Sequence, residues 1–203
     1  VNLSCMGGFF YGKWWQLHLR RKCLTIPVLE FLAACVNFIL FEPSVRYARA
    51  VVIEIDALAS PIALAKDAAK AKGMRAVLAE FRRLPQLTRL LDSECHLTCR
   101  HVFGEANPAA DAASRGYILE LRQLCESLGV HMQRVAPSAE AFSFINRVLA
   151  RLDAEPLTVA EREFDSTLGY PGEGPTVYAG LGSPSAGAAA AAGASTASGE
   201  HSG

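Results

Sequence analysis

The sequence predicts a mixed α/β domain, because segments with strand and helix character alternate along its first 130 residues. An aromatic-rich run with glycine turns, residues 6–19, comes first and is typical of a β-hairpin. The β-branched run 49–56 and the run 96–103 are the next strand candidates, and helical segments separate them. An order of hairpin, helix, strand, helices, strand and helix is that of a mixed sheet with helices packed on it.

The first helix is expected to be apolar on nearly all sides. Pro27 suits the first turn of this helix, which we expect to end near Phe41 because Pro43 follows. The run contains Glu30 and Asn37 and is shorter than the roughly 20 residues that a membrane span needs, so we expect a buried helix and no membrane association.

The middle of the chain predicts a strand and three helical segments. The continuous β-branched run 49–56 indicates a central strand covered on both faces. An alanine-rich helix over 57–72 is expected to end at Gly73, and helices over 74–84 and 85–91 follow. Further on, Asn107 followed by Pro108 predicts a helix that continues to about residue 128.

The composition divides the chain into three parts. Residues 1–130 form the predicted α/β domain, and residues 131–168 are expected to be a helical extension. Residues 169–203 are dominated by Gly, Ala, Ser and Pro, which predicts a disordered tail.

The charge and the cysteines limit the classes of function. Twenty basic and 20 acidic residues give a formal net charge of zero, so any contact with nucleic acid must depend on a local patch. The six cysteines follow no recognisable secretory signal in this sequence. We therefore expect reduced thiols and an intracellular location, in the cytoplasm or the nucleus.

Three acids lie at the edges of apolar elements, where packing does not call for a charge. Glu30 lies inside the apolar helix, Asp56 ends a strand, and Asp111 begins the helix after the next strand. Carboxylates suit Mg²⁺, and two such ions about 3.5–4 Å apart can promote phosphodiester hydrolysis. The three acids therefore predict a shared metal site. The simpler interpretation is an ion pair for Glu30, a helix cap for Asp56 and a first-turn charge for Asp111.

Residues 107–115 read Asn-Pro-Ala-Ala-Asp-Ala-Ala-Ser-Arg. They match the pattern Asn-x-x-Ala-Asp-x-x-Ser-Arg that often begins the last helix of ribonuclease H domains in retroelement reverse transcriptases. The element order, Glu30 in a helix and Asp56 after a strand resemble the same family, over residues 6–116. The resemblance implies a ribonuclease H-like mixed sheet flanked by helices. It also implies cleavage of the RNA strand of RNA/DNA hybrids, with Mg²⁺ or Mn²⁺ held by Glu30, Asp56 and Asp111, and a reverse transcriptase domain upstream.

One feature of this family has no counterpart in the sequence. The family carries a further aspartate on a first strand, before the glycine-rich turn, and residues 1–5 contain no acid. The resemblance therefore implies a sheet without its first strand, with a gap between the hairpin and the strand 49–56. A non-catalytic ribonuclease H-like remnant that binds nucleic acid or protein is the alternative function. A third interpretation is an unrelated α/β interaction domain whose acids are caps and ion pairs.

Basic and hydroxyl side chains supply candidates for nucleic-acid contacts. Arg75, Arg82 and Arg83 lie on the predicted helix 74–84, and Ser114 and Arg115 complete the motif around Asp111. Such side chains contact phosphates, and an A-form hybrid is recognised by its shape and 2′-hydroxyls. The simpler interpretation is a solvated helix face.

Overall fold

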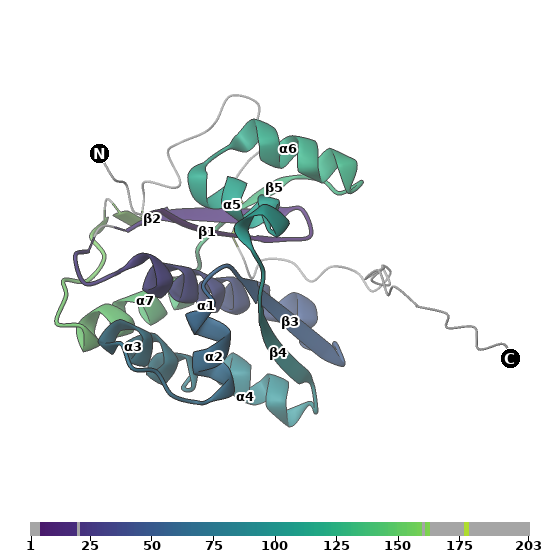
Figure 1. The fold of residues 1–203 in the computed structure, drawn as a ribbon. Coiled ribbons are helices and arrows are strands. Elements are labelled where there is room, and N and C mark those ends of the chain that lie inside the picture. Colours follow the sequence, from purple (N-terminus) through teal and green to yellow (C-terminus); the bar gives the residue numbers. More distant parts are fainter. Residues whose placement is uncertain (1–4, 20, 160, 163–176, 179–203) are drawn as a thin grey trace, which may run out of the picture.

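The computed structural model describes residues 5–19, 21–159, 161–162 and 177–178, and it has the predicted α/β architecture (Figure 1). A small mixed sheet is flanked by helices, as the sequence predicts. The strands are β1 (Cys5–Phe10), β2 (Lys13–His18), β3 (Ala50–Ile55), β4 (His96–His101), β5 (Gln133–Ala136) and β6 (Val177–Tyr178). The helices are α1 (Ile26–Val45), α2 (Ala59–Ala65), α3 (Lys72–Phe81), α4 (Pro85–Asp92), the 3₁₀ turn η1 (Gly104–Ala106), α5 (Pro108–Arg115), α6 (Ile118–Ser127) and α7 (Ala139–Arg151).

The predicted hairpin is confirmed as β1 and β2. Its two-residue turn places Tyr11 and Gly12 at positive φ, 47° and 83°, which matches the right-handed twist of paired strands. Neighbouring side chains on β2 point to opposite faces, so Trp14 packs with α5 and α6 while Trp15 joins the main core. Both indoles are fully buried. The hairpin therefore lies between two layers of helices, α1 on one face and α5 on the other (Figure 1).

Helix α1 is longer than predicted. It continues through Pro43 to Val45, so the prediction that it ends near Phe41 is wrong. A proline in the last turn removes one hydrogen bond, to the carbonyl of Ile39, and this loss does not stop a well-packed helix. Its 20 residues are long and apolar enough to cross a membrane by length and composition alone, but 72% of the apolar window is buried inside the protein. The helix forms the centre of the main core.

Strand β3 differs from the prediction of a central strand covered on both faces. Val51, Ile53 and Ile55 face the core, whereas Val52 is 52% exposed. On the exposed face Glu54 accepts a hydrogen bond from Nε of Arg100 on β4 (2.8 Å). A β-branched run favours any pleated strand, so it does not distinguish one covered face from two.

The hydrogen-bonded strands fall into two groups. One has the order β1–β2–β5–β6, with β1 antiparallel and β5 parallel to β2, and the other is the parallel pair β3–β4. In the described part of the chain no ladder joins β1 to β3. Among the described residues the hairpin and the strand 49–56 are thus separated, as the resemblance implies.

Two of the predicted helices have different boundaries in the structure. The helix predicted over 57–72 is the short α2 followed by a break, and Gly73 does not end it but lies in the first turn of α3. A Cβ at Gly73 would lie 2.7 Å from Cγ2 of Val28, so glycine there allows α3 to approach α1 closely. The helix predicted from Asn107 to about 128 is divided into α5 and α6 by Gly116, whose φ is 72°.

The core does not end at residue 130. Strand β5 pairs with β2, and α7 contributes buried side chains such as Phe144 and Leu149 to the core that α1 organises. The helical extension predicted for 131–168 is thus packed against the α/β domain in its described part. Of the predicted disordered tail 169–203, only Val177–Tyr178 lie within the described residues, where they pair with β5.

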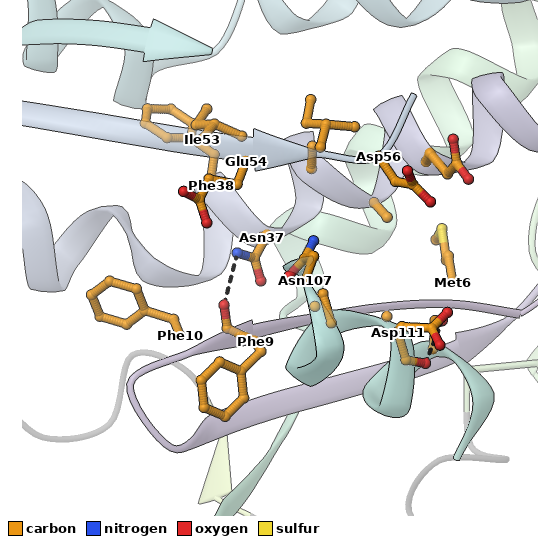
Figure 2. A pocket seen from close by; sticks show the side chains of 18 of the residues that line it. Met6, Phe9, Phe10, Asn37, Phe38, Ile53, Glu54, Asp56, Asn107 and Asp111 are labelled. Atoms are coloured by element: carbon orange, nitrogen blue, oxygen red, sulfur yellow. Dashed lines mark hydrogen bonds between the residues drawn. The ribbon is translucent and has the colours of Figure 1, made fainter. Parts of the chain in front are cut away.

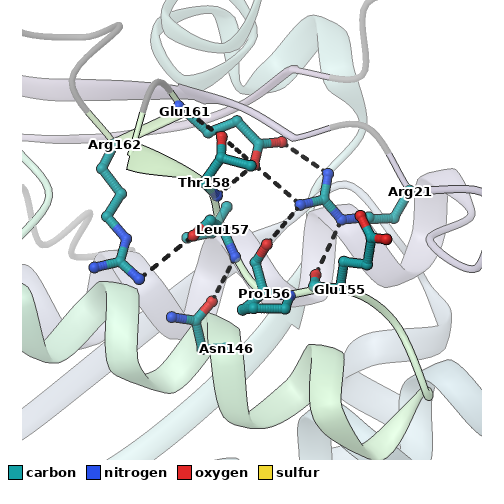
Figure 3. Close-up of polar contacts among 8 residues, drawn as sticks. All are labelled: Arg21, Asn146, Glu155, Pro156, Leu157, Thr158, Glu161 and Arg162. Atoms are coloured by element: carbon teal, nitrogen blue, oxygen red, sulfur yellow. Dashed lines mark hydrogen bonds and ion pairs between the residues drawn. The ribbon is translucent and has the colours of Figure 1, made fainter.

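An ion pair fastens the segment after α7 to the end of the hairpin (Figure 3). Arg21 donates to both carboxylate oxygens of Glu161, at 2.7 and 3.0 Å, and also to the carbonyls of Glu155 and Pro156. This bidentate contact, reinforced by the backbone and hydroxyl of Thr158, lowers the pKa of Glu161 to about 2. The segment after α7 is therefore held by an ion pair whose contribution to stability depends on pH.

Replacing Glu161 by Gln is expected to lower the free energy of unfolding by about 1–2 kcal/mol at pH 7, after allowance for solvent screening. Because the folded-state pKa lies below the ordinary value, this stabilisation is present above about pH 4.5 and is lost as the pH falls toward 2. Urea unfolding at pH 7 and near pH 2 would measure the change, with Glu126→Gln on exposed α6 as control. A difference that does not vary with pH would contradict the role of the ion pair.

Candidate functional site

A cavity of about 1110 Å³ lies between β1, β3, α1 and α5 (Figure 2). All three of the predicted metal ligands line it: Glu30 from α1, Asp56 just after β3, and Asp111 from the first turn of α5. Asp56 and Asp111 lie on opposite sides of one end of this cavity. Three acids that are far apart in the sequence are thus brought to one surface.

Asp111 lies at the cavity because helix α5 packs closely against the hairpin. A Cβ at Gly7 would lie 2.7 Å from the backbone nitrogen of Ser114, so only glycine permits this backbone-to-backbone contact. The side-chain amide of Gln16 donates to the carbonyl of Ser114 at 2.9 Å. Asp111 is therefore positioned by the contact between α5 and the hairpin.

Asn37 also belongs to the site. In the sequence it is apparent only as a polar residue in an apolar run. Its Oδ1 accepts a hydrogen bond from Nε1 of Trp15 at 2.9 Å, and its Nδ2 donates to the carbonyl of Phe9 at 3.4 Å. It lies two helical turns after Glu30, so both side chains face the cavity. This spacing of two polar residues in an apolar helix is the signal that could have identified it.

The acids divide into a close pair and a third member with its own partner. Burial raises the pKa of Glu30, and the negative charge of Asp56 raises it further. Asp111 instead accepts a hydrogen bond from Nε of Arg115 at 2.8 Å, one helical turn away. In the described ranges no three His, Cys, Asp or Glu side chains are close enough to hold one metal ion. The structure therefore places Glu30 and Asp56 close enough to interact electrostatically, and it pairs Asp111 with Arg115.

The predicted nucleic-acid contacts fall into two separate places. Ser114 and Arg115 line the cavity, where the Ser114 hydroxyl donates to the carbonyl of Asp111 at 2.9 Å. The other three residues belong to α3 or follow it, and they do not line this cavity. They contact nearby groups of the protein: Arg75 the carbonyl of Lys70, Arg82 the carboxylate and carbonyl of Asp67, and Arg83 the carboxylate of Glu80.

Replacing Glu30 by Gln is expected to stabilise the protein at pH 7, by less than about 1 kcal/mol because the side chain is only partly buried. A raised pKa in an acid means that the folded state holds the proton more tightly than the unfolded chain does. The free energy of unfolding of the parent protein therefore falls as the pH rises above about 4.5. The Gln variant has no ionisable group at this position and does not show this decrease. Urea unfolding at pH 7 and pH 3.5 would test this, and an equal effect at both values would contradict it.

Comparison with known proteins adds no relative. No protein-family model, no curated protein sequence and no solved structure matches this chain significantly. The candidate site therefore depends on the chemistry of its residues and on their placement in the fold.

Proposed function

We propose that this chain is a ribonuclease H-like domain of a retroelement reverse transcriptase polyprotein. Its activity would be metal-dependent cleavage of the RNA strand of RNA/DNA hybrids. The observation that carries the proposal is the convergence of Glu30, Asp56 and Asp111 on one cavity from three separate elements. The motif at 107–115 and the order of the elements support it.

The donor chemistry of the cavity suits Mg²⁺ or Mn²⁺. Carboxylate oxygens are the hard ligands that these ions prefer, and Glu30 and Asp56 would be two of them. Burial, and in addition the negative charge of Asp56, raise the pKa of Glu30, and a divalent cation held by the two carboxylates would favour their charged forms. When bound, the ions would activate water and stabilise charge on the phosphate.

The ion pair at α5 gives Arg115 a second role in the proposal. Its side chain is 58% exposed, so it can turn from Asp111 toward a phosphate of the hybrid. Such a turn would release the Asp111 carboxylate for the metal. Ser114 keeps α5 in place through its backbone contacts, whereas Arg75, Arg82 and Arg83 would contact the hybrid outside the cavity, if their present partners release them.

The family's further aspartate on a first strand has no counterpart in residues 1–5. Full activity is therefore expected only when another group supplies that ligand, for example residues of a longer polypeptide. A reverse transcriptase domain upstream and an intracellular location, in the cytoplasm or nucleus, belong to this proposal.

A non-catalytic binding module is the second candidate function. It is favoured by one specific observation, that Arg115 neutralises Asp111 while no three acids gather closely within the described residues. Such a module would bind an RNA/DNA hybrid or a protein without cutting the nucleic acid.

The test is cleavage of a labelled RNA/DNA hybrid in Mg²⁺ or Mn²⁺. Hybrid-specific cleavage is expected from a chain extended upstream of Val1, which can supply the missing ligand, and this chain is assayed beside it. Asp111→Asn is expected to lower the rate at least about 100-fold, because several kcal/mol of transition-state stabilisation by the metal are lost. The matched control is Asp92→Asn, at the exposed end of α4 and outside the cavity.

Two other outcomes would decide against this enzyme. Equal rates for Asp111→Asn and the parent chain would show that the cleavage does not come from this site. Absence of cleavage, both by this chain and by a chain extended upstream of Val1, would leave the binding module as the better explanation. Binding of uncleaved hybrid would then be measured by fluorescence anisotropy.

A further inference from the structure

Two strand edges face the same cavity from opposite sides. In the described residues β1 forms a strand ladder only with β2, and β3 only with β4. On the open edge of β1 the carbonyl of Phe9 accepts a hydrogen bond from Nδ2 of Asn37 at 3.4 Å. All six residues of β1 and the run 51–56 at β3 line the cavity between them. Each non-proline residue carries a backbone donor and an acceptor, and an open strand edge is a template for a further strand. This cavity has such an edge on both sides.

The side chains on these two strands form an interrupted layer over α1. Met6 and Phe10 point to the α1 side of β1. The ring of Phe10 stacks on that of Phe41 of this helix, with 5.2 Å between the ring centroids. On β3 the corresponding side chains are Val51 and Ile53, which pack against the same core. A strand between β1 and β3 would continue this layer with its own inward-facing side chains, since alternate residues of a strand share a face.

Helix α1 forms the bottom of the cavity, called its floor below, and small side chains there leave room for such a strand. The residues along one stripe of this helix line the cavity, and in the middle of the stripe lie the small side chains of Ala33 and Ala34. The 20 residues of α1 extend about 30 Å, whereas six residues of a strand extend about 20 Å. A strand of five or six residues therefore fits along the helix.

The size and lining of the cavity argue against a small molecule. Its volume of about 1110 Å³ exceeds the roughly 300–1,000 Å³ of ordinary small-molecule sites. Its two long walls offer backbone groups, and much of its floor is apolar. A second copy of this chain would present a strand already packed in a sheet, which cannot enter between two edges. A single extended segment can.

We propose that the groove between β1 and β3 binds one extended strand of a partner polypeptide, which joins the two groups of strands into one sheet. Main-chain hydrogen bonds to both edges give the affinity, as in strand addition to open sheets. Alternate apolar side chains face α1. A Lys or Arg at one end complements the carboxylates of Glu30 and Asp56, which both line the groove. The inference stands apart from the proposed nuclease activity, because it depends on the strand edges and the floor.

The experiment uses the full chain and a fluorescein-labelled peptide of alternating Val and Thr with Lys at each end. Fluorescence anisotropy is expected to show at least 10-fold tighter binding of this peptide than of one with Pro at two central positions, which lacks the needed N–H groups. Ala34→Trp, which fills the floor, is expected to weaken binding at least 10-fold. The matched control is Ala150→Trp at an exposed position of α7, and circular dichroism checks that both variants fold.

Hydrogen exchange identifies where the peptide binds. Slower exchange of backbone amides in both β1 and β3 is expected on addition of the peptide. Three results would overturn the proposal: no binding of the alternating peptide, equal binding of the proline peptide, or protection of one strand edge alone. Protection of the outer edge of β4 that grows with protein concentration would also overturn it, since it would indicate association between copies of the chain.

Discussion

Replacing both Arg147 and Arg151 by Met is expected to lower the free energy of unfolding by about 3–5 kcal/mol, because a buried carboxylate then loses its main partners. Glu80 is 2% exposed on α3, and it accepts hydrogen bonds from Nε of Arg147 (2.9 Å) and Nε of Arg151 (2.5 Å) on α7. Burial alone would raise the pKa of Glu80, but the hydrogen bonds and charges of the two arginines outweigh it and lower the pKa. Urea unfolding at pH 7 would measure the loss.

A third substitution distinguishes the effect of the unpaired Glu80 charge on stability from the effect of lost arginine packing. Adding Glu80→Met to the double variant is expected to recover most of the lost stability, since an apolar cluster of similar volume replaces the ion pairs without a buried charge. If the triple variant were no more stable than the double variant, the loss would come from the packing of the arginine stems and not from the unpaired carboxylate. Arg83, 3.5 Å from Glu80 and 68% exposed, remains in all variants.

Replacing Gly7 by Ala is expected to move α5 away from the hairpin and to cost about 1–3 kcal/mol of stability, as other insertions into tightly packed contacts do. The new Cβ would lie within 3 Å of three backbone atoms, the nitrogen and Cα of Ser114 and the carbonyl carbon of Ala113. Backbone cannot turn aside as a flexible side chain can, so the helix that carries Asp111 must shift. Faster hydrogen exchange in α5, together with urea unfolding, would detect this.

The matched control for that variant is Gly129→Ala. No atom lies within 4 Å of a Cβ at Gly129, although its φ of 64° makes alanine unfavourable there. Some stability is therefore lost, but the exchange of α5 amides is expected to stay unchanged. Unchanged exchange in Gly7→Ala as well would show that the close contact does not hold α5 in place.

Local patterns in the sequence were sufficient for the type and order of most elements. The aromatic-rich run 6–19 and its glycines predicted the hairpin, because strand preference and a two-residue turn with positive φ are local properties. The runs that became β3 and β4, and the proline that begins α4, are equally local signals. The mixed α/β fold class follows from their order. The ribonuclease H-like assignment stays a proposal, supported by the motif around Asp111.

The tertiary structure alone decided how these elements are spaced. It showed that Val52 is exposed and that Gly73 serves the close approach of α3 to α1, since both depend on which elements lie nearby. It also placed Glu30 beside Asp56, although 26 positions separate them, and left the groove open between β1 and β3. The sequence determined the elements by their local preferences. Their distances, and so the candidate site, were decided by packing between residues that are far apart in the chain.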